Sequence, residues 1–291
     1  MSAEDTSPLV SPEWVARRLD QPDQVLIEVD DRPGLYHLGH LPGARSVHLA
    51  GDLQDAVHRD APTPEAMVGL WQRLGITPSS TVIFYGDLHN WLAAYGYWLF
   101  TSYGLPDVRL LDGGRQAWLA EKLPLTQLVP GTPDNVSVPS PSFREERRAE
   151  RTDAVQAART GLLLDVRSPE EYVGDWLTEP EFSGEVAHRA GHIPGARSVP
   201  WDTVIDQRGR IKPVEELRHI YAAAGLRPDT EVVTYCRIGE RSAHTWFVLH
   251  ELLGHRPVRN YDGSWTEWGS MMRMPIQLGP EPGTLPAGFT G

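Results

Sequence analysis

The sequence predicts an α/β protein built from two tandem copies of one domain, each a parallel sheet with helices on both faces. The first observation is an internal repeat: the residues from His40 to Val47 recur from His192 to Val199, with Leu41 against Ile193 as the one difference. The second is that β-branched and apolar runs alternate with stretches of helical periodicity. Such alternation is typical of parallel sheets, which need a crossover helix between strands.

Further matches continue the repeat along the chain. Three pairs of segments match at a constant offset of 150 residues: 75–78 with 225–228, Tyr85 with Tyr235, and 111–118 with 261–268. The first copy is expected to have strands at 25–29 and 81–85 and helices at 64–74 and 91–102. The second copy is expected to have strands at 162–166 and 231–235 and helices at 213–224 and 242–253, with Gly254 ending the last helix.

The predicted domains are 1–122 and 149–291, joined by an extended linker at 123–148. The linker contains five prolines within 124–141 and little periodicity. The second copy also carries an insertion of about 15 residues around 174–189, because Asp165 and His192 are 27 positions apart where Glu28 and His40 are 12 apart.

Composition limits the function classes. The formal net charge of −12 argues against nucleic acid and against anionic membranes as partners. The first ten residues do not resemble a signal peptide, and no stretch is apolar enough to span a membrane. The single cysteine excludes an intramolecular disulfide, so a reducing cytoplasm is the expected location. Oligomeric state is left open.

That cysteine, Cys236, marks the expected functional site. It lies where the strand at 231–235 passes to the helix at 242–253, the edge of an α/β sheet where ligands bind. A core cysteine is the ordinary alternative, but Arg237, Gly239 and Arg241 follow closely, and buried guanidinium groups need partners. The helix N-terminus and the two arginines are expected to acidify the thiol and make it a nucleophile.

Two anion chemistries fit such a loop, namely phosphoryl transfer and sulfur transfer. Phosphatase loops of the tyrosine-specific type follow Cys-x5-Arg-Ser/Thr, whereas this chain has Cys-x4-Arg-Ser, which is one residue shorter. The first copy has Gly86 at the cysteine position and no cationic pair, so it is expected to be inactive. Asp87 there is expected to cap the following helix.

Other residues near the sheet edge have weaker claims. Arg167, directly after the strand at 162–166, could reach a bound anion or form a salt bridge with a nearby carboxylate such as Glu170 or Glu171. His192 has a counterpart in the first copy, His40, although that copy has no cysteine. This favours a structural role for His192 over pairing with the cysteine. No cluster has metal-ligand spacing, so neither a metal nor another cofactor is expected.

Taken with the repeat, these motifs resemble the rhodanese family. Its N-terminal signature is similar to 36–47, its C-terminal one to 261–268, and its active-site loop to 236–241. The resemblance implies an inactive first and a catalytic second rhodanese domain, with a persulfide on Cys236. It implies this set of substrate-binding residues: Arg237, Ile238, Gly239, Glu240, Arg241, Ser242 and Arg167.

The expected reaction moves a sulfane sulfur from thiosulfate to cyanide or a thiol. Mercaptopyruvate-type loops carry little charge, so the two arginines favour thiosulfate. Thiosulfate-type relatives often have a second arginine soon after the position of Arg167, where this chain has the segment 168–172. The alternatives are a 3-mercaptopyruvate sulfurtransferase, a cysteine-dependent phosphatase and a non-catalytic sulfur-carrier module.

Overall fold

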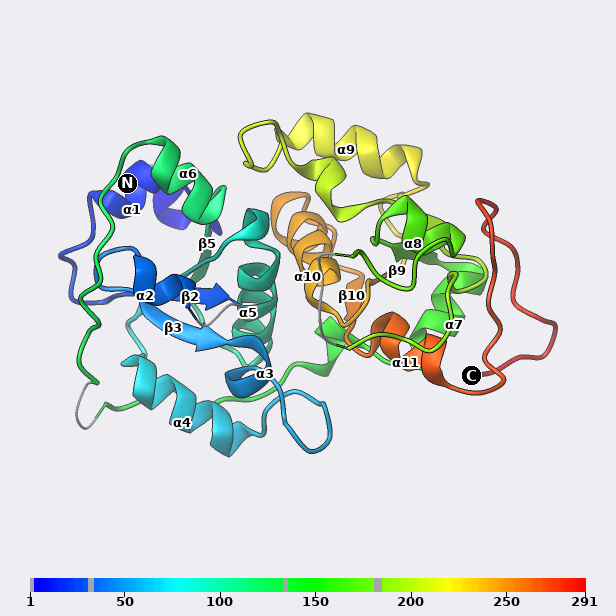
Figure 1. Ribbon diagram of the computed structural model, residues 1–291, viewed down its shortest axis with the longest axis horizontal. Coiled ribbons are helices and arrows are strands. Elements are labelled where there is room, and N and C mark those ends of the chain that lie inside the picture. Colours follow the sequence, from blue (N-terminus) through cyan, green and yellow to red (C-terminus); the bar gives the residue numbers. More distant parts are fainter. Residues whose placement is uncertain (1–2, 31–33, 133–135, 181–184) are drawn as a thin grey trace. The chain divides into compact units, whose positions relative to one another are not determined.

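The structure is a computed structural model that describes residues 3–30, 34–132, 136–180 and 185–291. Contacts divide the chain into two compact units (Figure 1). Unit 1 comprises Met1–Arg144 with Asp206–Ile211, and unit 2 comprises Glu145–Ile205 with Lys212–Gly291. Among the described residues, no helix is both long and apolar enough to cross a membrane.

Unit 1 contains a five-stranded parallel sheet in the order β1-β5-β4-β2-β3. Its strands are β1 (Leu9–Val10), β2 (Gln24–Asp30), β3 (Arg45–His48), β4 (Thr81–Tyr85) and β5 (Val108–Leu111). Its helices are η1 (Ala3–Thr6), α1 (Pro12–Ala16), α2 (Leu35–Leu38), α3 (Leu49–Asp52), α4 (Pro64–Leu74), η2 (Leu88–Asn90), α5 (Trp91–Ser102) and α6 (Gly114–Ala120).

Unit 2 repeats this arrangement in the order β6-β10-β9-β7-β8, again with parallel strands. Its strands are β6 (Arg148–Ala149), β7 (Leu162–Asp165), β8 (Arg197–Ser198), β9 (Val232–Tyr235) and β10 (Val258–Tyr261). Its helices are η3 (Glu145–Arg147), α7 (Arg151–Thr160), α8 (Pro169–Val173), η4 (Trp201–Val204), α9 (Val214–Ala223), α10 (Glu240–Phe247), the π-helical η5 (Val248–Leu252) and α11 (Ser264–Ser270).

The two sheets have the same strand order, which confirms the predicted fold class of two repeated α/β domains. The predicted bounds of β4, α4 and α5 agree with the structure to the residue. The strands β1, β3, β5, β6, β8 and β10 were not predicted; β1, β6 and β8 have two residues each, too few to show a periodicity, and the other three have four.

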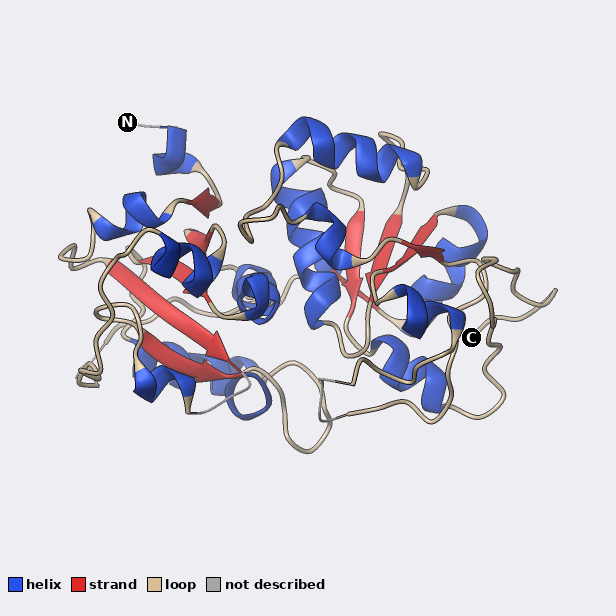
Figure 2. Cartoon of the chain, turned by 45° about the horizontal axis from the view of Figure 1, so that its top comes forward, coloured by secondary structure: helices blue, strands red, loops and turns tan. Residues whose placement is uncertain are grey.

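The strands of unit 2 lie between helices (Figure 2). Side chains of a strand point alternately to the two faces of its sheet, and those of β9 do so. Val233 and Tyr235 face a core that also contains Trp265 and Trp268 of α11 and residues of α7. On the other face, Thr234 Oγ1 donates to the Ser242 carbonyl of α10. Burial on both faces explains the continuous apolar run of β9 and fixes the direction in which the chain leaves it.

The helix after β9 starts earlier and ends differently from the prediction. The α-helical part runs from Glu240 to Phe247, and the next turn is π-helical, with Leu253 N–H donating to the Val248 carbonyl. Gly254 then adopts φ +68°, which agrees with its predicted role in ending the helix. The early start brings Glu240 into the first turn, directly beside the cysteine loop.

Candidate active site

Cys236 is fully buried at the carboxyl end of β9, and the turn between β10 and α11 holds its backbone. The Cys236 N–H donates to Ser264 Oγ at 3.1 Å. In return, the N–H groups of Trp265 and Thr266 donate to the carbonyls of Cys236 and Arg237 at 3.1 and 2.9 Å. These bonds fix both residues at the start of the loop, and the predicted C-terminal signature contains their partners.

Gly239 shapes the loop around the sulfur atom. Its φ of +93° lies in the left-handed region, and a Cβ atom there would stand 2.5 Å from Asp262 Oδ1 and 3.0 Å from the Asp262 carbonyl oxygen. This backbone directs the Gly239 N–H to Cys236 Sγ at 3.2 Å. The loop therefore supplies a backbone donor to the sulfur, as a cradle for an anionic sulfur requires.

The loop residues after Cys236 are nearly all enclosed. Ile238 is buried, and Ser242 Oγ lies 3.0 Å from the Gly239 carbonyl oxygen and 2.6 Å from Asn260 Oδ1. Asn260 Nδ2 also donates to the Gly239 carbonyl. Ser242 thus supports the glycine turn through its side chain. The substrate-contact roles predicted for these residues stay predictions.

The nearest charged group to the thiol is a carboxylate. Glu240, which is 1% exposed, places Oε2 at 3.4 Å from Cys236 Sγ, so that the thiol donates a hydrogen bond to it. Its other oxygen lies 3.3 Å from Arg237 Nη2. Arg237 is 6% exposed, against 0% for Arg241.

The expectation of an acidified thiol is wrong for the resting protein. Burial raises the pKa of Cys236, and the Glu240 carboxylate raises it further. Arg241 and the hydrogen bonds from Ser242 lower this pKa, but their effect is smaller. The cations near the cysteine would lower its pKa, but desolvation and the carboxylate of Glu240 act in the opposite direction and outweigh them.

We therefore expect the resting thiol to ionise late. Because its pKa is raised, the thiolate fraction should still increase above pH about 8.5, where an ordinary cysteine is half ionised. Thiolate absorbance in the ultraviolet, with iodoacetamide alkylation rate as a second measure, tests this on the one cysteine of the chain. A thiolate signal already complete at neutral pH would contradict it.

Arg241 is held by carboxylates from two different segments. Its Nη1 and Nη2 atoms lie 2.7 and 3.1 Å from the two oxygens of Glu171, and Nη1 lies 3.0 Å from Glu179 Oε1. Glu171 and Arg241 are both fully buried. Glu179 belongs to the predicted insertion at 174–189, so this extra segment contributes directly to the site.

Arg167 is likewise tied to protein groups. Nη2 lies 2.6 Å from Asp165 Oδ2 and donates to the Gly191 carbonyl at 2.7 Å, and the guanidinium carbon lies 4.6 Å from the centre of the Trp265 ring. The salt bridge to a nearby carboxylate, suggested as the alternative for Arg167, is present, with Asp165 as the partner in place of Glu170 or Glu171. The predicted contact of Arg167 with substrate stays a prediction.

The charges around the loop do not sum to a cationic site. Among the described residues with ion pairs here, three guanidinium groups, from Arg167, Arg237 and Arg241, face four carboxylates, from Asp165, Glu171, Glu179 and Glu240. An incoming anion would therefore meet cations whose charge is already balanced. Arg237 is the most exposed of the three.

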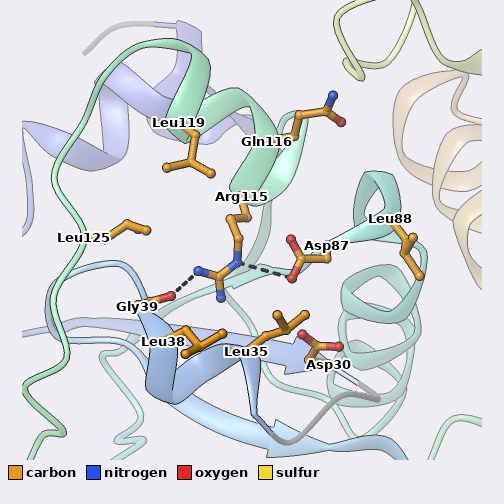
Figure 3. A pocket seen from close by; sticks show the side chains of 10 residues that line it. All are labelled: Asp30, Leu35, Leu38, Gly39, Asp87, Leu88, Arg115, Gln116, Leu119 and Leu125. Atoms are coloured by element: carbon orange, nitrogen blue, oxygen red, sulfur yellow. Dashed lines mark hydrogen bonds and ion pairs between the residues drawn. The ribbon is translucent and has the colours of Figure 1, made fainter.

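Unit 1 has a different construction at the equivalent place. Asn90 Oδ1 accepts from the N–H of Gly86, which stands where unit 2 has Cys236. Asp87 makes no capping hydrogen bond with its side chain, so the predicted cap is wrong; its carboxylate instead lies 3.3 Å from Arg115 Nε. A cavity of about 520 Å³ lies beside these residues, with leucines around it and Arg115 within it (Figure 3).

Each unit buries a guanidinium group with equivalent partners. In unit 1, Arg115 pairs with Glu28 and donates to the Gly39 carbonyl; in unit 2, Arg167 pairs with Asp165 and donates to the Gly191 carbonyl. The repeat aligns these partners with each other, as it aligns the tyrosines that donate to the same carboxylates, Tyr85 and Tyr235. A copy without a nucleophile thus keeps this ion pair, which indicates that the pair supports the fold.

The repeated histidines also have matching environments. His192 stacks on Tyr172 at 3.6 Å between ring centres and hydrogen-bonds with the Tyr172 and Glu281 carbonyls. His40 stacks on Tyr36 at 3.8 Å and likewise bonds with two carbonyls. In each unit these contacts connect a helix, α2 or α8, with a loop of the same chain. Within the described ranges, no group of His, Cys, Asp and Glu is arranged to hold a metal ion.

Fold, repeat and loop together define a known class of protein. The family model of the rhodanese-like domain matches residues 11–121 and 148–271. The chain therefore belongs to the rhodanese family and carries two rhodanese-like domains in tandem. Its relatives support a sulfurtransferase activity.

Among these relatives, the Sulfur carrier protein TtuD of Thermus thermophilus is 46% identical over 94% of this chain and 97% of its own length. A protein of Mycobacterium leprae named "Putative thiosulfate sulfurtransferase SseA" is 45% identical over 96% of this chain and 93% of its own. Among solved structures, an EanB variant with a persulfide on a cysteine and with ergothioneine superimposes with a TM-score of 0.80, at 25% identity over 95% of this chain and 71% of that one. YnjE gives 0.79, at 25% identity over 94% and 68%.

Several residues of the site were not predicted as such. Glu179, Asn260 and Ser264 contact the loop from segments distant in the sequence, and pattern alone gave no reason to select them. A signal did exist for Ser264, because it lies within the repeated segment 261–268, where unit 1 has glycine at the matching position.

Proposed function

We propose that the protein is a sulfurtransferase in which Cys236 accepts a sulfane sulfur from thiosulfate as a persulfide and passes it to a thiol or cyanide. The observation that carries this proposal is the position of Cys236 Sγ, which receives the Gly239 N–H at the carboxyl end of β9. The sulfur attacks the outer sulfur of the donor, a new S–S bond forms, and sulfite leaves with the electron pair of the broken S–S bond.

Relatives and neighbours support this chemistry. Curated relatives of nearly the same length have thiosulfate sulfurtransferase in their names, and one solved neighbour carries a persulfide on a cysteine. No residue of the loop requires a cofactor for this reaction. The short loop, Cys-x4-Arg, disfavours the phosphatase alternative.

Thiosulfate as the donor rests mainly on Arg237. Its guanidinium is the most exposed of the three near Cys236, so it is the group we propose to hold a sulfonate oxygen and stabilise departing sulfite. Arg241 instead stabilises the loop through its ion pairs with Glu171 and Glu179. The balanced charge of the site keeps 3-mercaptopyruvate, a less anionic donor, as the alternative within the class.

Changing Arg237 to glutamine is expected to slow thiosulfate turnover about 10- to 100-fold, because one charge-assisted contact contributes roughly 1.5–3 kcal/mol. The loss should be smaller with 3-mercaptopyruvate. Initial rates of wild type and variant with thiosulfate, 3-mercaptopyruvate and an aryl phosphate provide the measurement. Equal losses with both sulfur donors would show that Arg237 does not recognise the sulfonate, and turnover of only the aryl phosphate would overturn the proposed function.

A sulfur-carrier role is the second candidate. The relative from Thermus thermophilus has that name, and the complete burial of Cys236 fits a sulfur that is protected until a partner arrives. A carrier would form the persulfide with thiosulfate but transfer it slowly to cyanide and small thiols. Single-turnover discharge rates of the isolated persulfide distinguish a carrier from an enzyme with free access for small acceptors.

A further inference from the structure

The contact between Cys236 and Glu240 has a chemical use in addition to positioning. We propose that Glu240 is the acid–base residue of sulfur transfer, which moves a proton between Cys236, the transferred sulfur and an incoming thiol. The inference rests on the proposed function, since it concerns how the same persulfide is made and discharged.

The geometry meets the first requirement of a proton carrier. Glu240 Oε2 lies 3.4 Å from Cys236 Sγ, which is a direct hydrogen bond for a sulfur donor. The proton can therefore pass between the two residues without an intervening group. Glu240 is 1% exposed, so water does not compete at this contact. Its other oxygen faces Arg237 Nη2 at 3.3 Å, and this contact holds the side chain of Glu240 in orientation.

The groups around the loop leave the proton on the Cys236 thiol, in a hydrogen bond with Glu240. Arg237 is the charged neighbour on the loop, and Arg241, across the first turn of α10, carries charge that Glu171 and Glu179 balance. The thiol therefore keeps its proton at rest and shares it with Glu240. A nucleophile that remains protonated until the donor arrives needs a base in contact, and Glu240 is the carboxylate at that distance among the described residues.

The proton can be followed through both half-reactions. When Cys236 Sγ attacks the outer sulfur of thiosulfate, Glu240 accepts the thiol proton, sulfite departs, and Glu240 returns the proton to the outer sulfur of the persulfide. When a thiol acceptor enters, Glu240 takes its proton, the thiolate attacks the outer sulfur, and the S–S bond to Cys236 breaks. Cys236 leaves as thiolate and regains a proton from Glu240. Atoms and charge balance without an oxidant or reductant.

This assignment distinguishes acceptors by their protons. A thiol must lose its proton before it attacks, whereas sulfite at mildly alkaline pH attacks without a base. Discharge to a thiol should therefore depend on Glu240 far more than discharge to sulfite. The acceptor class to which the site is suited is then a thiol.

The test is Glu240→Gln, which keeps the size of the side chain and removes its basicity. We expect the thiolate absorbance to appear at lower pH, because a negative charge beside the sulfur is gone. Persulfide formation from thiosulfate at neutral pH should be slower, but by less than about fivefold, because the larger thiolate fraction offsets the lost base; discharge to sulfite, the reverse of this step, should change by the same factor. Single-turnover discharge to dithiothreitol should fall about 100-fold, the usual size of a lost general acid–base step, with less than a fivefold change for sulfite.

Two results with Glu240→Gln would contradict the acid–base role of Glu240. If Glu240 only raises the pKa of the thiol, the variant will have more thiolate and faster transfer in both half-reactions, and the proposal fails. Equal loss with dithiothreitol and sulfite also overturns it. A wild-type protein that forms no persulfide would instead refute the proposed function, so the two failures are distinguishable.

Two further variants control for structure. Glu215→Gln neutralises another first-turn glutamate that pairs with an arginine three positions away, on the exposed surface of α9, and should leave every rate unchanged. Glu240→Asp keeps a carboxylate one methylene shorter and should recover part of the thiol-dependent discharge. Circular dichroism confirms folding of each. A Glu240→Asp variant as slow as Glu240→Gln with dithiothreitol would contradict the acid–base role.

Discussion

Replacement of Cys236 by alanine is expected to remove all sulfur transfer while the protein stays folded. The chain has no other cysteine to form a persulfide, and the loop backbone is held by the β10–α11 turn through bonds that do not involve the thiol. Turnover with thiosulfate and cyanide should fall to the uncatalysed background, a loss of at least about 10⁴-fold for a nucleophilic enzyme.

Mass spectrometry gives the direct measurement. Wild-type protein treated with thiosulfate and desalted should gain the mass of one sulfur atom on the peptide that contains Cys236, and the alanine variant should gain none. Cys236→Ser is the matched control, because it retains a polar atom at the same place without sulfur chemistry. Wild-type protein that turns over thiosulfate without the added sulfur would disprove the covalent route.

Changing Arg241 to glutamine is expected to have the largest effect on stability. The variant leaves Glu171 buried without its bidentate partner, and breaking a buried ion pair from one side costs roughly 3–5 kcal/mol in the free energy of unfolding. Urea denaturation of wild type and variant at neutral pH measures this difference.

The effect of Arg241 should also depend on pH with a definite sign. Burial alone raises the pKa of Glu171, and the charge and hydrogen bonds of Arg241, with contributions from Arg167 and Ser168, more than offset it, so the folded-state pKa is lowered. A lowered pKa stabilises the folded protein above the unfolded value of about 4.3 and ceases to do so as the pH falls through the folded value. Without Arg241, burial should hold the pKa of Glu171 above its wild-type folded value, so the deficit of Arg241→Gln should shrink as the pH falls from the raised pKa of the variant to the lowered pKa of the wild type.

The surface pair Arg218–Glu215 provides the comparison for this variant. Both side chains are more than half exposed, so Arg218→Gln should change the free energy of unfolding by less than about 1 kcal/mol. A difference for Arg241→Gln no larger than that would mean that the buried pair relaxes or admits water, contrary to the geometry described here.

The sequence predicted the fold well because two independent signals agreed. The repeat doubled every observation, and central elements such as β4 and α5, which are almost entirely buried, stand out as apolar runs. The edge strands β6 and β8 were missed because they have two residues each, and their pairing with β10 and β7 is a property of the assembled sheet. Helix ends shifted where backbone conformation decides them, as with the π-helical turn at Val248–Leu252.

The location of the site stays a prediction, whereas the electrostatics of the loop differ from the expectation. The loop at 236–241 is contiguous, so one motif identified it, and the structure places its residues together as expected. The charge balance depends on partners from other segments: Glu171 and Glu179 lie 70 and 62 positions before Arg241. No local pattern reveals whether such a carboxylate comes close. The acidified thiol was predicted wrongly for another reason, because desolvation and the Glu240 carboxylate of the loop itself raise the pKa of Cys236.

The matching guanidinium groups of Arg115 and Arg167 show how a residue-by-residue reading of a duplicated chain can mislead. The two arginines reach corresponding carboxylates from different ends of the domain sequence: one follows the last strand of its sheet and the other follows β7. The two units share a guanidinium group at the same place in the domain, but different positions of the backbone supply it. Transplanting the arginine between these positions within one unit, rather than deleting it, would ask whether folding requires the residue or only its charge at that point.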